Sequence, residues 1–221
     1  ARSIIAEPCR RDTAPCIGLA ATLISRQDSA ATMVVMPADH VIEPAGEFQR
    51  AIEIAGLLIK ENGRRLITLG IKPNRPATGY GYIHRGVRLE KTQELPAFRV
   101  EQFREKPARE LAEQYVQSGD YYWNSGIFVW TATTICDELR SKRPQLVDSL
   151  ERIGVSWGGP SQETVFTDEY ERIEPISIDY AVLEHSTDVV VIEAGFRWDD
   201  VGSWGAISRL HEADAEANTV R

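Results

Sequence analysis

The sequence predicts an α/β fold with a mainly parallel, mixed central sheet, and three observations support this prediction. Helical and strand patterns alternate along the chain, as they do in βαβ units. Neither an internal repeat nor a low-complexity tract interrupts the alternation. The 221 residues are 43% hydrophobic and 26% charged, which is the balance of a globular protein that buries a sizeable core.

The first half of the chain supplies two helices and two strands. Apolar residues recur at helical spacing over 13–26, after a Thr13 cap and an early proline, and this predicts the first helix. The nearly continuous apolar run 31–36 predicts a short strand buried on both faces. A second helical stripe covers 48–59, and 66–69 predicts the next strand.

The second half continues the alternation. The same patterns predict helices over 108–117 and 134–150, strands over 121–130 and 188–193, and a closing helix over 203–215. Neither GxGxxG nor GxxxxGK[ST] occurs, and the first strong element is a helix. Doubly wound nucleotide-binding domains usually open with a strand and a glycine-rich turn. We therefore expect either a fold without that loop or a chain that lacks its beginning.

Charge and composition exclude several classes of protein. The 25 Lys and Arg residues against 33 Asp and Glu residues give a net charge of −8, which argues against a nucleic-acid partner. A small phosphorylated ligand needs only local cations and stays open. No apolar run reaches the length of a membrane span, and residues 1–11 do not resemble a signal peptide. Cys9, Cys16 and Cys136 form no CxxC pair, so we expect reduced thiols in a cytoplasmic protein.

Two acidic residues follow predicted strands and are candidate metal ligands. Asp39 comes directly after the strand at 31–36, and Asp199-Asp200 follows the strand at 188–193. Ligands of open α/β sheets bind beyond the carboxyl ends of strands, and Mg²⁺ takes one or two carboxylates together with phosphate oxygens. Asp39 can equally be read as a turn cap, and Asp200 as the acidic first turn of a helix.

Four further residues are candidates for contacts with a phosphorylated ligand, its sugar or its base. Lys106 is a candidate cation for a phosphate, or a solvated lysine in a turn. Gly81 would let the backbone approach a ligand, or mark the start of a strand. Asn124 suits sugar hydroxyls or local backbone groups. Glu7 could accept from the two donors on the guanine edge, or be a surface residue. The four histidines lack HExxH spacing, and no GxSxG elbow is present.

Seven short segments, taken in order, carry a family resemblance. They are Glu7-Pro with Arg11-Asp-Thr-Ala-Pro15, Pro37-Ala-Asp-His40, Gly79-Tyr-Gly-Tyr-Ile83, Glu105-Lys-Pro107, Trp123-Asn-Ser-Gly-Ile127, Ser177-Ile-Asp-Tyr-Ala181 and Trp198-Asp-Asp-Val-Gly-Ser-Trp204. Over nearly its whole length the chain resembles the mannose-1-phosphate guanylyltransferases, a family of sugar nucleotidyltransferases.

The resemblance implies a fold, a reaction and a set of site residues. The fold is a Rossmann-like three-layer α/β/α nucleotidyltransferase domain, here a single catalytic domain over 1–221 that we expect to be incomplete at both ends. The reaction makes GDP-mannose and pyrophosphate from GTP and mannose 1-phosphate with Mg²⁺, for glycoconjugate synthesis. The implied roles are catalysis by Lys106, Asp39 and Asp200, metal binding by Asp39 and Asp200, and substrate binding by Glu7, Gly81, Glu105, Asn124 and Asp179.

Departures from the family keep alternatives open. The glycine-rich loop that should precede this region, and the C-terminal domain that follows it in many members, are not in the sequence. Asp12 stands where the family more often has Asn, and Cys16 where it has Ala. A nucleotidyltransferase for another sugar 1-phosphate and a non-catalytic regulatory homologue that binds sugar nucleotides are the alternatives. The sequence also leaves a homo-oligomer open.

Overall fold

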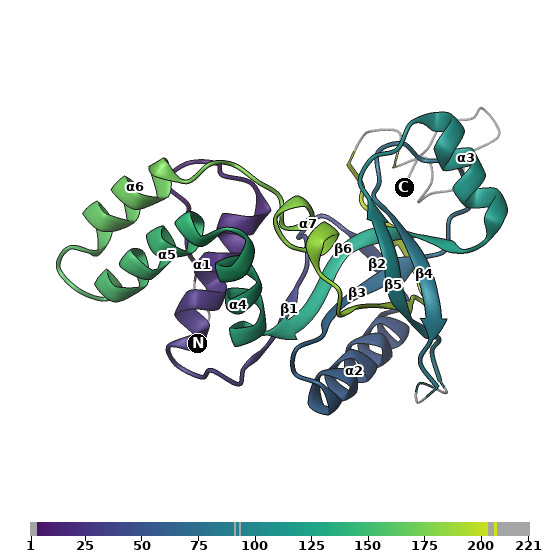
Figure 1. Cartoon of the computed structure of the whole chain (residues 1–221), viewed down its shortest axis with the longest axis horizontal. Helices are drawn as coiled ribbons and strands as arrows, with labels where there is room; N and C mark the ends of the chain where they lie inside the picture. Colours follow the sequence, from purple (N-terminus) through teal and green to yellow (C-terminus); the bar gives the residue numbers. More distant parts are fainter. Residues whose placement is uncertain (1–3, 91, 93, 203–205, 207–221) are drawn as a thin grey trace.

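The fold is that of a six-stranded sheet with helices on both sides (Figure 1). We describe it from a computed structural model, which describes residues 4–90, 92, 94–202 and 206. The helices are α1 (Thr13–Ser25), α2 (Ala45–Glu61), α3 (Arg109–Ser118), α4 (Ala132–Lys142), α5 (Pro144–Ser156), α6 (Gln162–Arg172), α7 (Ile178–Ala181) and the 3₁₀ turn η1 (Leu183–His185). The strands are β1 (Thr32–Val35), β2 (Val41–Glu43), β3 (Leu66–Ile71), β4 (Tyr82–Arg88), β5 (Ala97–Arg104), β6 (Tyr121–Thr131), β7 (Val189–Glu193) and β8 (Arg197–Asp199).

The large sheet is mixed, as the sequence predicts, but its pairings are mostly antiparallel rather than mainly parallel. Its order is β1-β6-β3-β7-β5-β4, and β4 also pairs with the first residues of β6. Strands β1, β3, β4 and β7 run in one direction, whereas β5 and β6 run in the other. Because the two opposed strands are interleaved with the rest, β3–β7 is the parallel pairing and the other described pairings are antiparallel.

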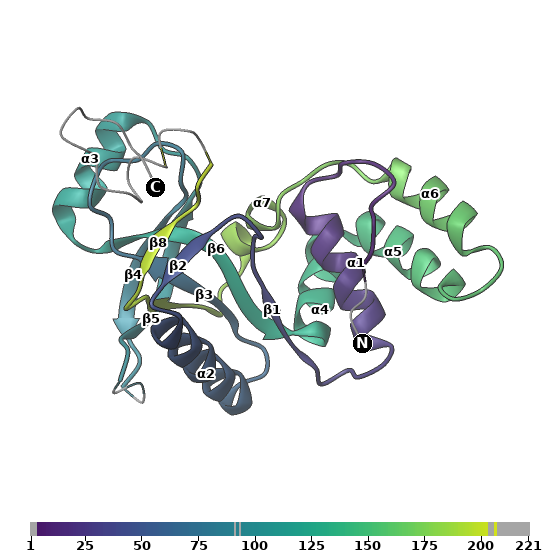
Figure 2. The same cartoon turned by 180° about the vertical axis from the view of Figure 1, so that it is seen from behind.

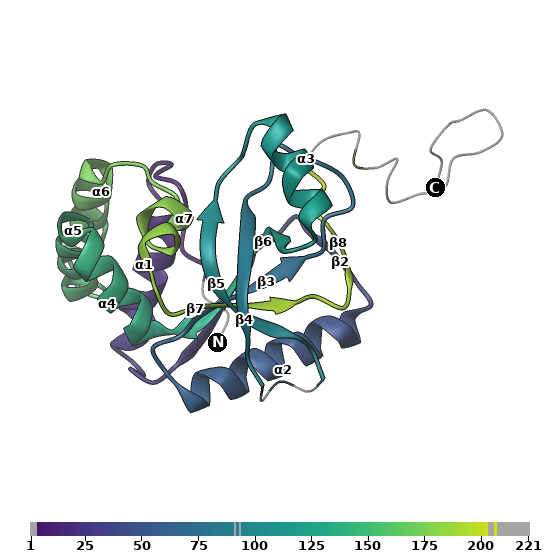
Figure 3. The same cartoon turned by 45° about the vertical axis from the view of Figure 1, so that its right-hand side comes forward.

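Alternate residues of the central strands face two hydrophobic cores, which makes the molecule three layers deep. Leu66 and Val191 belong to the core shared with α1, α4, α5 and α6, whereas Ile67 and Ile192 belong to the core shared with α2 and α3. Figure 3 shows α2 along one side of the sheet and the α1, α4, α5 and α6 group on the other. The expected three-layer α/β/α architecture is confirmed.

Two sequence expectations about individual elements are wrong. The strand at 31–36 is not buried on both faces, because β1 is at the end of the sheet order and Val34 is 43% exposed. The helix expected over 134–150 is two helices, α4 and α5. Pro144 cannot donate a backbone hydrogen bond and disfavours helical geometry at Arg143, where φ is −140° and ψ is 61°.

The other expected elements form within a few residues of their predicted bounds. The helix expected at 203–215 lies, apart from Ala206, outside the described residues. No helix in the described part of the chain is long and apolar enough to cross a membrane.

Candidate active site

A small two-stranded sheet brings Asp39 and Asp200 to one place. Strands β2 and β8 pair antiparallel, with Val41 opposite Asp199, and they lie side by side in Figure 2. Asp39 stands just before β2 and Asp200 just after β8, so the antiparallel register puts both at the same end of the pair. Sequence reasoning placed each residue at a strand end but missed β2 and β8 themselves.

Both carboxylates of this aspartate pair (Asp39 and Asp200) lie close enough to His40 to act on its imidazole. Burial lowers the pKa of His40, and the negative charges of Asp39, Asp200 and Asp199 act in the opposite direction. The indole Nε1 of Trp198 donates to His40 Nδ1 at 3.1 Å, which fixes the ring.

The neighbours Asp199 and Asp200 have different partners, as the sequence predicts for adjacent residues. Asp199 is buried, and its Oδ1 accepts from the backbone N–H of Val201 at 2.9 Å. Asp200 Oδ1 instead accepts from the hydroxyl of Tyr80 at 2.8 Å. Burial, and then the carboxylate of Asp200, raise the pKa of Tyr80 to about 12, so this hydroxyl keeps its proton at neutral pH.

A bulge in β6 positions Asn124. The register between β3 and β6 shifts between Thr68 and Gly70, where β6 carries extra residues. Asn124 Oδ1 accepts from Thr68 Oγ1 and from the N–H of Gly126, each at 3.2 Å. Gly126 has a φ of +70°, which suits glycine, and the space beside its Cα is bounded by Pro37 and His40. The bulge therefore connects Asn124 to the segment that carries Asp39.

Four predicted substrate-binding residues form one group, which we call the acidic cluster (Gly81, Glu105, Asn124 and Asp179). The backbone N–H of Asn124 donates to the carbonyl of Gly81 at 2.8 Å, and Asn124 Nδ2 donates to Asp179 Oδ1 at 2.9 Å. A Cβ on Gly81 would lie 2.5 Å from Glu105 Oε2. The sequence grouped these residues through the resemblance alone, and the structure places them in contact.

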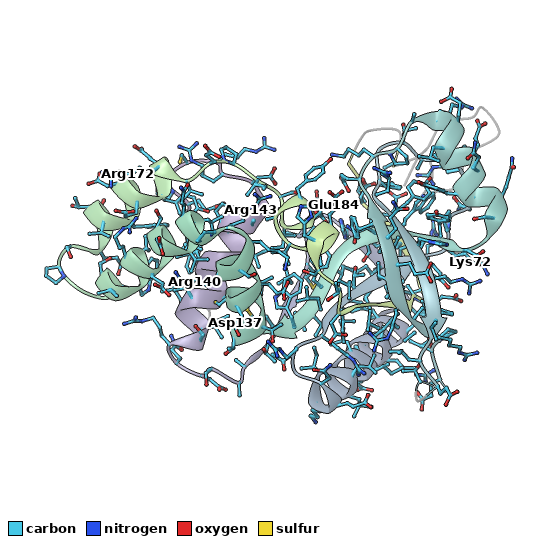
Figure 4. All side chains as sticks on the ribbon, in the orientation of Figure 1. Lys72, Asp137, Arg140, Arg143, Arg172 and Glu184 are labelled. Atoms are coloured by element: carbon cyan, nitrogen blue, oxygen red, sulfur yellow. The ribbon has the colours of Figure 1, made fainter. Side chains whose placement is uncertain are left out.

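Burial and like charges perturb the carboxyl groups of the acidic cluster. Burial, and then the charge of Glu105, raise the pKa of Asp179 to about 6, with a smaller contribution from Asp12. Burial also raises the pKa of Glu105, and the charge of Glu184 adds to this. Glu184 belongs to η1, between the helical side of the molecule and the sheet (Figure 4). Perturbed carboxyl groups gathered in this way are typical of functional sites.

Lys106 lies at the edge of the acidic cluster. Its Nζ is 3.6 Å from Glu105 Oε1, and its side chain is 63% exposed, whereas that of Glu105 is 15% exposed. Lys106 has a φ of +41°, an uncommon backbone geometry for a residue with a side chain. An exposed ammonium beside a partly buried carboxylate is well placed to meet a phosphate from solvent.

The start of α1 brings Asp12 towards the acidic cluster. The cap is Asp12 rather than the expected Thr13: its carboxylate accepts from the Thr13 N–H at 2.7 Å. Thr13 Oγ1 accepts from the N–H of Ile178 at 2.8 Å, and this ties the start of α1 to α7, which carries Asp179.

Glu7 has its described contacts elsewhere. It is exposed, and its Oε1 accepts from the hydroxyl of Tyr170 on α6. A role in reading the base therefore stays a prediction.

The aspartate pair suits a hard divalent cation that is also bound by its substrate. Within the described residues, no group of three or more His, Cys, Asp and Glu side chains could hold a metal by itself. Mg²⁺ usually takes one or two carboxylates and completes its six positions with phosphate oxygens and water. Two carboxylates at one end of β2 and β8 fit that donor set.

Sequence reasoning missed the residues that surround the aspartate pair. Tyr80 contacts Asp200, Arg75 and Trp198. Tyrosine, arginine and tryptophan are common in cores and loops, so residue type alone does not mark these three residues as part of a site. The tyrosine inside Gly79-Tyr-Gly81 was the available signal, because glycines on both sides expose a ring that a strand interior would bury.

A hollow of about 610 Å³ lies apart from these residues, beside α5 on the helical side of the molecule, where Figure 4 labels Arg143 and Arg172. None of the predicted site residues lines it. The positive charge of its arginines is partly neutralised, because Glu169 forms ion pairs with Arg152 at 2.7 Å and with Arg172 at 3.2 Å. We therefore locate the candidate site at the aspartate pair and the acidic cluster.

Comparison with known proteins shows the family of the chain. The model of the nucleotidyl transferase family matches residues 1–217. The chain belongs to this family. It is 41% identical, over 98% of its length, to the mannose-1-phosphate guanylyltransferase of Escherichia coli K12, of which the match covers 45%. It is 38% identical, over 98% of its length, to the xanthan biosynthesis protein XanB of Xanthomonas campestris pv. campestris, again covering 45%.

A solved structure gives the same result for the fold. The crystal structure described as mannose-1-phosphate geranyltransferase from Thermus thermophilus matches with a TM-score of 0.80 and 33% identity, over 93% of this chain and 57% of that one. The resemblance seen in the sequence is confirmed. The chain spans less than half the length of the two curated relatives.

Proposed function

We propose that this chain transfers GMP from GTP to mannose 1-phosphate, giving GDP-mannose and pyrophosphate. The observation that carries the proposal is the aspartate pair beside the acidic cluster and Lys106, in a chain 41% identical to a mannose-1-phosphate guanylyltransferase. Each part of this arrangement matches one part of the substrates.

The acidic cluster suits the sugar. Sugar hydroxyls are donors, and ionised carboxylates and the Asn124 side chain supply strong acceptors and a further donor. Asn124 already donates to Asp179 at 2.9 Å, so its amide and the Asp179 carboxylate present a fixed polar surface. Lys106, exposed beside Glu105, binds the phosphate on the sugar as a point charge.

Asp39 and Asp200 would hold Mg²⁺ together with phosphate oxygens of the nucleotide. Bound there, the ion supplies positive charge that offsets the negative charge of the α-phosphate and of the attacking sugar phosphate. Tyr80 keeps the Asp200 carboxylate in place through its hydrogen bond, and Trp198 holds the ring of His40, which follows Asp39 in the chain.

The transfer itself needs no general base. An oxygen of the sugar phosphate is already an anion, and it attacks the α-phosphorus of GTP while the bond to the pyrophosphate oxygen breaks on the opposite side. Catalysis then consists of positioning and charge neutralisation. In this scheme Glu105 orients Lys106, and Lys106 orients the sugar phosphate.

Pyrophosphate release from GTP and mannose 1-phosphate, measured with and without Mg²⁺, tests this function. We expect Mg²⁺-dependent release, and a loss of about 10²–10³ in kcat for Asp200→Asn. Full Mg²⁺-dependent turnover by Asp200→Asn would contradict the metal role.

Two other functions give different results in the same experiment. A panel of four nucleoside triphosphates and several sugar 1-phosphates would reveal a transferase for another sugar or base. No turnover with any pair, together with a melting temperature raised by GDP-mannose, would show a regulatory homologue that binds sugar nucleotides.

A further inference from the structure

Tyr80 lies between the two halves of the candidate site. Its hydroxyl donates to Asp200 Oδ1 at 2.8 Å, on the side of the aspartate pair. The next residue is Gly81, whose carbonyl accepts from the Asn124 N–H at 2.8 Å, on the side of the acidic cluster. One residue therefore touches one half through its side chain and joins the other through its backbone.

The ring of Tyr80 is held from several sides. It packs edge-to-face against Trp123 at 5.1 Å and against Trp198 at 5.2 Å between ring centroids. The guanidinium of Arg75 lies 4.9 Å from the Trp123 ring, and its Nη2 is 3.4 Å from the Tyr80 oxygen. Aromatic contacts of this kind restrict the ring to one orientation. The hydroxyl is consequently a fixed donor.

A fixed donor also fixes its acceptor. A carboxylate has about four lone-pair directions, and the bond from Tyr80 uses one of them and sets the rotation of the Asp200 carboxylate. A metal ligand that is hydrogen-bonded by a neighbouring group in this way is held ready for the ion, and loss of such a partner typically weakens metal binding about 10–100-fold.

We propose that Tyr80 is a positioning residue, whose hydroxyl sets the orientation of the Asp200 carboxylate for the metal. The peptide bond between Tyr80 and Gly81 then fixes the position of the metal site relative to the acidic cluster. The proposal rests on the proposed function, because it takes Asp200 as a metal ligand. It assigns to Tyr80 a role that packing alone would not require, since phenylalanine would fill the same space.

Tyr80→Phe tests this role, because it removes the hydroxyl and keeps the ring between Trp123 and Trp198. We expect the Mn²⁺ dissociation constant, measured with GDP-mannose present by electron paramagnetic resonance of the free ion, to rise at least tenfold. We also expect a tenfold higher Mg²⁺ requirement for turnover, with the KM for mannose 1-phosphate within twofold of wild type.

Tyr122→Phe is the matched control. The Tyr122 hydroxyl also donates to a carboxylate, Glu193 Oε2, at 2.5 Å, and the residue belongs to the core rather than to the site. We expect it to leave both metal measurements unchanged, even if it lowers the melting temperature.

The three informative results separate the two proposals. Wild-type Mn²⁺ binding by Tyr80→Phe would overturn the positioning role and leave the proposed function intact. An equal loss in Tyr122→Phe would also overturn it, because the effect would then be one of general stability. Failure of the unsubstituted protein to bind Mn²⁺ even with GDP-mannose present would remove the metal role of Asp200, and the positioning role with it.

Discussion

Replacing Gly81 by alanine probes the acidic cluster with a single methyl group. The new Cβ would lie 2.5 Å from Glu105 Oε2, 3.3 Å from Phe103 Cε1 and 3.4 Å from Asn124 Cβ. Ordinary contact begins at about 3.4 Å, so the Glu105 carboxylate must move by about 0.9 Å (3.4 − 2.5). The other two neighbours need to move little or not at all.

This displacement should affect activity far more than stability. The Glu105 carboxylate ends a flexible side chain, so the cost in unfolding free energy is about 1 kcal/mol, the low end for overpacking. A misplacement of about 1 Å in a substrate-positioning group costs about 10²-fold in rate. We therefore expect kcat/KM for mannose 1-phosphate to fall about 100-fold, while the melting temperature shifts by about 2–4 °C at most.

The assay is pyrophosphate release at varied mannose 1-phosphate, with thermal unfolding of the same samples. Gly79→Ala is the matched control, because a Cβ there has no atom within 4 Å. Activity of Gly81→Ala within threefold of wild type would refute the reasoning about Glu105. Equal impairment of Gly79→Ala would show that loss of backbone freedom, rather than the contact with Glu105, causes the effect.

Three other substitutions test the remaining assignments. The pKa of Asp179 is about 6, against an ordinary value of 3.8, so the folded state holds a proton that the unfolded state releases. The contribution of Asp179 therefore lowers the free energy of unfolding as pH rises from about 4 to about 6. Asp179→Asn should therefore raise the free energy of unfolding at pH 7.5 by up to ~3 kcal/mol, with the gain vanishing near pH 4 in urea titrations. Lys106→Ala should raise the KM for mannose 1-phosphate at least tenfold and leave the KM for GTP unchanged. The control Lys60→Ala, on α2, should change neither KM. A change in the KM for GTP alone would contradict the phosphate role of Lys106. If Glu7 reads guanine, the preference for GTP over inosine triphosphate should be about tenfold and should disappear in Glu7→Gln.

The fold was largely predictable because its longer elements carry clear periodicity. The pattern at 13–26 became α1 (Thr13–Ser25), and the pattern at 48–59 lies within α2 (Ala45–Glu61). The break between α4 and α5 was equally readable from Pro144, but the apolar spacing on both sides of it favoured one helix. Burial of β1 could not be predicted, because it depends on which strands lie beside it.

The candidate site residues could be named from the sequence, but their arrangement could not be predicted. Asp39 and Asp200 were visible as acidic residues at strand ends, but β2 and β8 have three residues each, too few for a readable period. Their pairing joins distant parts of the chain and is decided by the tertiary fold. Tyr80 was missed for the same reason, since its role comes from a hydrogen bond to Asp200.

Charge explains why the two halves of the site need each other. Glu105, Asp179 and Glu184 act on one another, in a chain with a net charge of −8. At about 5 Å and an effective dielectric constant of about 20, each carboxylate opposes a phosphate charge by about 3 kcal/mol. Lys106 offsets one such charge. In the proposed function, positive charge at the aspartate pair would meet the remaining repulsion, so we expect the acidic cluster to accept a sugar phosphate when a cation is bound beside it.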